Sequence, residues 1–177
     1  MKTSLIIPCF NESRGIPALL ARCQEIIGER DIEVVIVDNG SSDDTQEVLA
    51  PLLQKYSFVT LINVAVNKGY GYGILSGLKG ASGNILAWTH ADLQTDPGDI
   101  IKALEFFEES NRSELLFVKG KRYGRPLIDV IFTIGMSIFE TILMKTKMWD
   151  INAQPTVFHR SFYESWENPP KDFSLDL

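Results

Sequence analysis

Cysteine is scarce in this chain of 177 residues, which contains only two. Cys9 follows an apolar run and Cys23 has helical spacing with apolar neighbours, so both are expected to be small side chains of the core. Two such residues do not form the disulfide framework of a small secreted protein. We therefore expect the protein to work in the reducing cytoplasm.

Positive charge is also in short supply. Lysine and arginine number 17 against 23 aspartates and glutamates, and the formal net charge is -6. A nucleic-acid binder presents a basic face to the phosphates, so this balance argues against a nucleic-acid partner. Hydrophobic residues make up 45% of the chain, which is enough for one substantial core. We expect a single domain over residues 1–177.

Long uncharged apolar runs are missing too. The first apolar run begins at Leu5 and is too short for the core of a signal peptide, so export is not expected. The most apolar stretch, Leu127–Met144, is interrupted by Asp129 and Glu140 and falls short of the roughly 20 apolar residues that span a bilayer. The chain ends at Leu177 without a visible stop signal, as expected for a short natural form or for a C-terminally truncated domain.

Short β-rich runs alternate with amphipathic stretches along the chain. The pattern predicts strands at residues 5–7, 33–37, 59–63, 85–88 and 115–119, with helices between them. This alternation is typical of an α/β fold, in which helices cover a largely parallel sheet. In such folds ligands collect at the carboxyl ends of the strands.

Three polar segments follow predicted strands. Residues 8–12 read Pro-Cys-Phe-Asn-Glu, residues 38–45 read Asp-Asn-Gly-Ser-Ser-Asp-Asp-Thr, and residues 90–97 read His-Ala-Asp-Leu-Gln-Thr-Asp-Pro. Any one of them has an ordinary explanation as a helix cap or a turn. Their order is more specific, because all three are predicted to open onto one edge of the sheet.

Together with residues 67–69 and 120–123, these segments resemble family 2 glycosyltransferases of the GT-A fold, especially the branch of dolichol-phosphate mannose synthase and other polyprenyl-phosphate glycosyltransferases. The resemblance covers essentially the whole chain. It implies a Rossmann-like, mostly parallel sheet flanked by helices. It also implies a metal-dependent, inverting enzyme that moves a sugar from a nucleotide-sugar donor to a polyprenyl phosphate or glycan acceptor.

Two other functions stay open at this point. A nucleotidyltransferase would favour a glycine-rich phosphate loop near the N-terminus, and residues 8–12 lack one. A noncatalytic module that binds a nucleotide sugar is compatible with His90, which stands where the family has Asp. Measurable turnover with a donor would reject the module.

The resemblance implies which residues bind the nucleotide sugar. The candidates are Pro8, Phe10, Glu12, Val37, Asp38, Asn39, Ala91, Asp92 and Arg122. The first three would line the base and ribose pocket, Val37 and Asn39 would continue its floor, and Asp38 would stabilise its turn or contact the base. The family commonly has Asp at the position of Asn39, where an amide keeps an acceptor and adds a donor. Arg122 matches a basic residue near the diphosphate, whose oxygens a guanidinium binds in bidentate fashion.

A divalent metal, Mg or Mn, is the implied cofactor, because the charge that grows on the leaving diphosphate must be stabilised. The family motif reads Asp-Ala-Asp-Leu, often followed by Gln; here Asp92 and Gln94 remain, and they are the candidate metal residues. Oxygen ligands of this kind suit either metal. His90 replaces the first Asp, and it either coordinates, which would favour manganese, or hydrogen-bonds the backbone. Asp96, next to Pro97, better suits a helix cap.

The acceptor side is expected at residues 150–155, which resemble the acid motif of the family's acceptor loop. Asp150 is the candidate catalytic base if the acceptor is a hydroxyl, which must lose its proton as it attacks. A lipid phosphate is already largely anionic at neutral pH, since its second pKa lies near 6. With that acceptor, Asp150 would mainly organise the loop.

Basic residues flank the apolar stretch Leu127–Met144. Between residues 119 and 147, six lysines and arginines face two acids, which is a local net charge of +4. One interpretation is an amphipathic segment that lies on an anionic bilayer, and would place the enzyme at the inner face of the cell membrane. A buried core helix is the other, because periodicity does not separate the two.

Overall fold

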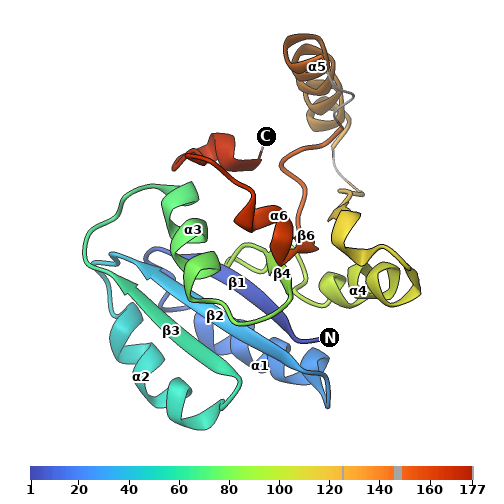
Figure 1. Ribbon diagram of the computed structural model, residues 1–177. Coiled ribbons are helices and arrows are strands. Elements are labelled where there is room, and N and C mark those ends of the chain that lie inside the picture. Colours follow the sequence, from blue (N-terminus) through green and yellow to red (C-terminus); the bar gives the residue numbers. More distant parts are fainter. Residues whose placement is uncertain (125, 146–148, 177) are drawn as a thin grey trace.

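A computed structural model describes residues 1–124, 126–145 and 149–176 (Figure 1). Its centre is a sheet in the order β3-β2-β1-β4-β6-β5. The strands are β1 (Thr3–Cys9), β2 (Ile32–Asn39), β3 (Val59–Val64), β4 (Ile85–Trp88), β5 (Phe117–Lys119) and β6 (Thr156–His159). β1 to β4 are mutually parallel where they pair, whereas β6 runs antiparallel to β4 and β5. The prediction of an α/β fold with a mostly parallel sheet is confirmed.

Helices cover both faces of this sheet. On one face, α1 (Ile16–Ile27), α2 (Thr45–Lys55) and α4 (Asp99–Glu109) pack in a single apolar cluster with the sheet. On the other, α3 (Tyr70–Gly80) packs together with residues of α6 (Arg160–Glu164) and of the 3-10 segment η2 (Phe173–Asp176). Because both faces are covered, β2 is buried along almost its whole length and is rich in Val and Ile.

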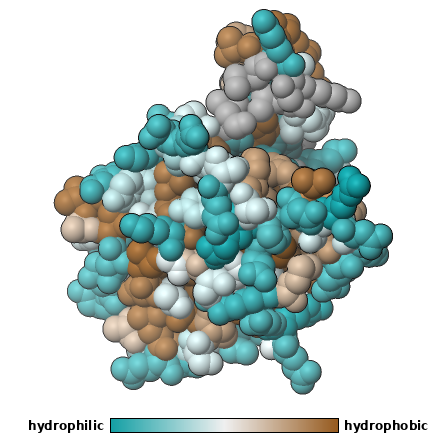
Figure 2. All heavy atoms as spheres, in the orientation of Figure 1, coloured by the Kyte–Doolittle hydropathy of each residue, from teal (hydrophilic) through white to brown (hydrophobic). Residues whose placement is uncertain are grey.

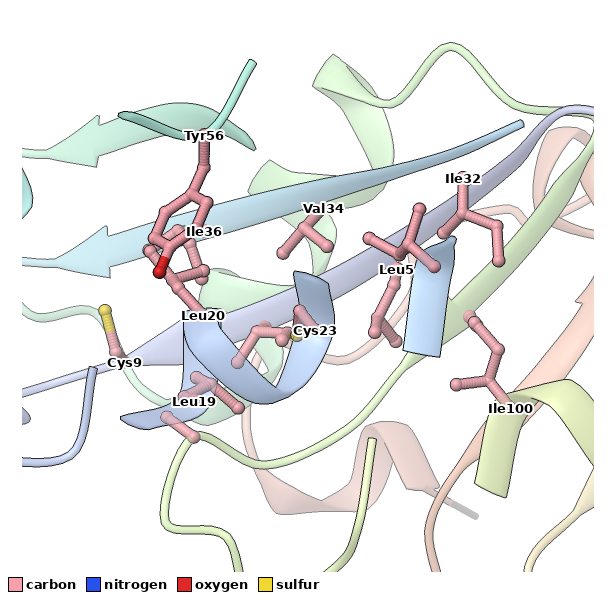
Figure 3. Close-up of a cluster of buried hydrophobic side chains, with 14 of the residues drawn as sticks. Leu5, Cys9, Leu19, Leu20, Cys23, Ile32, Val34, Ile36, Tyr56 and Ile100 are labelled. Atoms are coloured by element: carbon pink, nitrogen blue, oxygen red, sulfur yellow. The ribbon is translucent and has the colours of Figure 1, made fainter. Parts of the chain in front are cut away.

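The core under α1 follows the predicted helical face. Leu20 and Cys23 of α1 lie near Ile36 and Leu5 of the sheet (Figure 3), and Leu19 is buried in the same cluster. Cys9 and Cys23 are free and buried, as expected, and burial raises the pKa of each thiol to about 12. Both therefore act as apolar core residues rather than as reactive thiols.

The far edge of the sheet differs from the prediction. Leu115, the first residue of the last predicted strand, ends the 3-10 helix η1 (Ser113–Leu115), and β5 begins only at Phe117, so β5 is shorter than predicted. Its neighbour β6 was not predicted, because four residues between a proline and a helix give too little alternation to be recognised. β6 pairs with both β4 and β5, and it thereby places residues 150–155 beside the end of β4.

The helix α5 (Leu127–Met144) projects away from the sheet and its helices (Figure 1). The exposed apolar side chains among its described residues are Leu127, Ile128, Val130, Ile134, Met136, Ile138, Phe139, Ile142 and Leu143. The interpretation of this stretch as a core helix is therefore wrong, and Figure 2 shows the brown apolar surface on the projecting part. Across the described ranges, no helix combines the length and apolarity needed to cross a bilayer.

Candidate functional site

The first two polar segments meet at the carboxyl ends of β1 and β2. Asn11, which adopts a left-handed backbone conformation, accepts through Oδ1 a hydrogen bond from the backbone of Ser42 (2.8 Å). In return, the backbone amide of Asn11 donates to Ser41 Oγ (2.9 Å), and the backbone amide of Glu12 donates to Thr45 Oγ1 (3.1 Å). The two loops are thus tied together, as the sequence order predicted, and form one wall at this edge of the sheet.

Asp38 supports that wall from inside. Its side chain is buried, with Oδ1 accepting from the Ser41 amide (3.0 Å) and Oδ2 accepting from Gln46 Nε2 (2.7 Å). Of the two roles expected for Asp38, the structure shows the turn-stabilising one.

Asn39 connects the end of β2 to the loop before α3. Its Nδ2 donates to the carbonyl oxygen of Gly69 (2.9 Å), and its Oδ1 accepts from the amide of Lys68 (3.5 Å). A carboxylate could not make the first of these bonds, because it has no hydrogen to donate. The loop before α3 therefore gives a structural reason for Asn at a position where Asp is common.

The other candidates for nucleotide binding differ in how far they reach the surface. Phe10 is 45% exposed, and Pro8 and Glu12 are partly exposed beside it. The side chains of Val37 and Ala91 are buried, and Val37 packs in the cluster under α3. A ligand at this edge would therefore meet Phe10, Pro8 and Glu12 first.

Three carboxylates, those of Glu12, Asp43 and Asp92, gather at this edge of the sheet. Burial raises the pKa of Glu12, and the negative charges of Asp92 and Asp43 raise it further. Asp92 is exposed. Its Oδ1 accepts from the backbone amide of Gln94 (3.0 Å), while its Oδ2 accepts no hydrogen bond from the described residues. An exposed carboxylate with unused oxygen lone pairs, next to other negative charge, is suited to attract a divalent cation.

No group of three acidic, histidine or cysteine side chains that could hold a metal by themselves occurs in the described part of the chain. His90 is stacked on the ring of Tyr70, with 5.6 Å between the ring centroids. Asp96 accepts from the backbone amide of Gly98 and pairs with Arg22. The capping role expected for Asp96 is wrong, because the N-cap of α4 is Gly98 and has no side-chain capping hydrogen bond; Asp96 stabilises the turn before the helix instead.

Arg122 and Asp150 were expected on the donor and acceptor sides, and the structure brings them into direct contact. Arg122 donates to Asp150 from its backbone amide (3.1 Å), from Nε (2.7 Å) and from Nη2. Asp150 is buried at a backbone φ of 48°, and its amide donates to Ser137 Oγ of α5 (3.2 Å). The carboxylate expected to act as a base is thus a partner of the guanidinium.

Comparison with known proteins identifies the family. Residues 4–161 match the model of glycosyl transferase family 2. The chain is a member of glycosyltransferase family 2. It is 35% identical over 123 residues to a dolichol-phosphate mannosyltransferase of Pyrococcus furiosus, a match that covers 70% of this chain and 34% of that relative.

This family 2 chain has a similar relation to an undecaprenyl-phosphate 4-deoxy-4-formamido-L-arabinose transferase of Serratia proteamaculans, at 32% identity over 114 residues, covering 61% of this chain and 34% of the relative. It therefore spans about a third of the length of these curated relatives. A mannosyltransferase from Pyrobaculum calidifontis, solved with GDP-Man and Mn²⁺, superimposes with a TM-score of 0.73 at 21% identity, over 99% of this chain and 49% of the neighbour. The predicted GT-A fold and family are confirmed.

A second polar cluster in this family 2 domain was missed from the sequence. Asp176 Oδ1 accepts from Trp88 Nε1 (3.3 Å), Gln154 Nε2 (3.3 Å) and Lys119 Nζ (3.4 Å). Trp88 was expected to be a packing residue, and it is buried, but its indole N–H also serves this cluster. The four residues are far apart in sequence and share no local pattern, so their contact depends on β6 lying between β4 and β5 in the sheet.

Proposed function

We propose that this domain transfers a sugar, with inversion, from a nucleotide-sugar donor to a polyprenyl phosphate at a membrane surface. One observation carries the donor half of the proposal: the exposed carboxylate of Asp92 lies at the strand ends, near Glu12 of the loop that also carries Phe10. The names of the two curated relatives support a lipid-phosphate acceptor, with a glycan acceptor as the alternative.

The residues present fit a divalent metal. Asp92 would hold the ion, with Gln94 beside it and oxygen atoms of the donor diphosphate completing the shell. When bound, Mg or Mn would neutralise the charge that develops on the leaving diphosphate. His90 stacks on the ring of Tyr70, and we propose no metal contact for it.

Donor recognition divides between contact residues and supporting residues. We propose that Phe10, Pro8 and Glu12 contact the base and ribose, and that Arg122 contributes charge near the diphosphate. Val37, Asp38 and Asn39 are buried, and we assign them to the frame that holds the loops. Ala91 is buried next to Asp92, so its backbone is the part that we expect to face the donor.

The acceptor half of the proposal depends on α5. Its exposed apolar side chains include Phe139 (60% exposed) and Ile142 (71% exposed), and it reaches back to the site through Ser137, which accepts from Asp150. Exposed apolar surface of this extent marks a protein or membrane contact. We propose that α5 rests on the inner face of the cell membrane, where a lipid phosphate would reach the turn at Asp150. Arg125 and Lys147, two of the basic residues expected to help, lie outside the described residues.

With a phosphate acceptor, the chain need not supply a strong base, because the nucleophilic oxygen is already largely anionic. Asp150 then orients Arg122, in agreement with the three hydrogen bonds between them. A hydroxyl acceptor would require Asp150 to leave the guanidinium and take up the hydroxyl proton.

The test has two stages. UDP-, GDP- and dTDP-sugars are first screened with manganese for thermal stabilisation, because a ligand that binds the folded state raises its stability by mass action. The stabilising donor, radiolabelled in the sugar, is then incubated with undecaprenyl phosphate in detergent. Metal-dependent formation of a labelled lipid supports the proposal. Donor binding without transfer to lipid phosphate or glycan would leave a binding module instead.

A further inference from the structure

A small polar cavity lies between α5 and the turn that carries Asp150. Its volume is about 170 Å³, and the polar side chains around it include Arg122, Ser137, Glu140, Asp150 and Asn152. Two carboxyl groups therefore share this cavity with one guanidinium.

The two carboxyl groups are in opposite situations. Asp150 accepts hydrogen bonds from three nitrogen atoms of Arg122. Glu140 is only 7% exposed, and its Oε2 has no hydrogen-bond partner among the described residues. Burial raises the pKa of Glu140, as expected for a carboxyl group that lacks a partner. A buried carboxylate without a partner is costly, so this one calls for a group that pairs with it.

The guanidinium of Arg122 has a free edge for that purpose. Asp150 occupies Nε and Nη2, while Nη1 makes no hydrogen bond to the described residues. A guanidinium carries five N–H groups and can bind two carboxylates through separate edges. The Arg122 side chain is 34% exposed and so has room to adjust.

Glu140 also lies on the correct face of α5. It follows Ser137 by three residues, which puts both side chains on one face of the helix. Ser137 Oγ already accepts from the Asp150 amide, so this face of α5 is turned toward the Asp150 turn while the apolar residues remain exposed. A Glu140 contact would add a charged link to that single hydrogen bond.

We propose that Glu140 is a positioning residue for Arg122. The structure shows the ion pair of Arg122 with Asp150 and none with Glu140, and we infer that in solution the free edge of the guanidinium turns to Glu140, so that Arg122 bridges Asp150 of the domain body and Glu140 of α5 in the donor-free protein. The bridge fixes α5, and with it the apolar surface, relative to the site. It also holds the edge of the guanidinium that the donor diphosphate would use. Donor and Glu140 therefore compete for Arg122; this second part rests on the proposed function.

Thermal unfolding distinguishes a Glu140 that pairs with Arg122 from a Glu140 without a partner, because the two cases predict changes in Tm of opposite sign. Glu140→Gln removes the charge at nearly constant volume. If Arg122 pairs with Glu140, the Tm of the donor-free protein falls by about 2–4 °C for each kcal/mol of lost pairing. If Glu140 has no partner, the same change leaves Tm unaltered or raises it. Glu108→Gln, on the exposed surface of α4, is the matched control.

A double-mutant cycle assigns the effect to Arg122. In an Arg122→Gln background, Glu140→Gln should no longer lower Tm, because the partner is already gone. Additive effects would overturn the bridge. If Arg122→Gln does not fold, the same cycle is measured with Arg122→Lys. The NMR signal of the Arg122 side chain is also compared between wild type and Glu140→Gln. An unchanged signal would overturn the bridge.

Nucleotide binding tests the competition. Glu140→Gln should bind the preferred nucleoside diphosphate about five-fold or more tightly than wild type, a coupling of the usual size between linked sites. A merely structural role would leave affinity unchanged or weaken it, and either result would overturn the competition. If neither UDP nor GDP binds the wild type, the proposed function fails, whereas the thermal cycle still decides the bridge.

Discussion

Asn39 Nδ2 donates to the carbonyl oxygen of Gly69 at 2.9 Å, and this bond ties the end of β2 to the loop that begins α3. Asn39 is 4% exposed, so water cannot readily replace the lost donor. Asn39→Asp would place a carboxylate oxygen against a carbonyl oxygen inside the protein.

We therefore expect Asn39→Asp to lower the free energy of unfolding by about 1–3 kcal/mol, the usual cost of an unsatisfied buried polar group. Urea unfolding of both proteins measures it. Asn63→Asp, at an exposed position of β3, should have little effect. Equal losses at the two positions would show that the Gly69 contact is not the cause.

The hydrogen bonds of Asp43 lead us to expect that the stability of the protein depends on pH. Hydrogen bonds from Thr45, the largest effect, and from Ser13 lower the pKa of Asp43 to about 2. In an unfolded chain an aspartate titrates near 3.9. Ionised Asp43 therefore contributes fully to the stability of the folded protein above about pH 4, and this contribution is lost as the pH falls toward 2.

Thermal unfolding of wild type and Asp43→Asn from pH 6 to pH 2 checks this. The difference in Tm should be constant above about pH 5 and should shrink below pH 4. Asp44→Asn, at the exposed neighbouring position, is the control and should show no such trend. A Tm difference that is independent of pH would contradict the assignment.

Metal dependence is expected to centre on Asp92. Asp92→Ala deletes the exposed carboxylate at the strand ends, so nucleoside diphosphate binding should lose most of its dependence on a divalent cation. Calorimetry with UDP and GDP, with manganese and with EDTA, measures it. Asp99→Ala, in the first turn of α4, should retain the dependence. Equal affinities with and without metal in the wild type would refute the metal bridge.

The membrane contact of α5 is tested by replacing exposed apolar residues. Phe139→Ser with Ile142→Ser should reduce co-sedimentation with anionic vesicles, because both side chains are more than half exposed. Phe106→Ser, at a similarly exposed position of α4, is the control. Unchanged binding in the α5 variant, or binding that the control reduces equally, would remove α5 from the contact.

The sequence predicted the parts of this structure that depend on local pattern. The parallel strands, the buried face of α1 and the meeting of residues 8–12 with residues 38–45 all follow from periodicity and from strand ends that share an edge. The resemblance supplied the family, which the family model confirms over residues 4–161, and the candidate site residues, whose roles stay predictions.

What the sequence could not provide are contacts between distant segments. Nothing local indicates that Arg122 pairs with Asp150, since the two are 28 residues apart and were assigned to different halves of the site. The same holds for Lys119 and Asp176, which β5 and β6 bring together. The apolar stretch of α5 was ambiguous because periodicity shows that one face is apolar, but not what that face contacts.

The last prediction concerns Asp150, whose role differs between the two acceptor classes. Asp150→Asn keeps the size of the side chain but removes the charge that faces Arg122, so we expect a lower Tm as well as any catalytic effect. Transfer is therefore measured well below the Tm of the variant, alongside nucleotide affinity for both proteins. With a hydroxyl acceptor, loss of the base should reduce transfer about 10²–10⁴-fold while donor affinity changes little. With a polyprenyl phosphate the reduction should be much smaller, because its nucleophilic oxygen is already largely anionic. Unchanged transfer to a hydroxyl acceptor would rule out Asp150 as the base and leave it as the residue that orients Arg122.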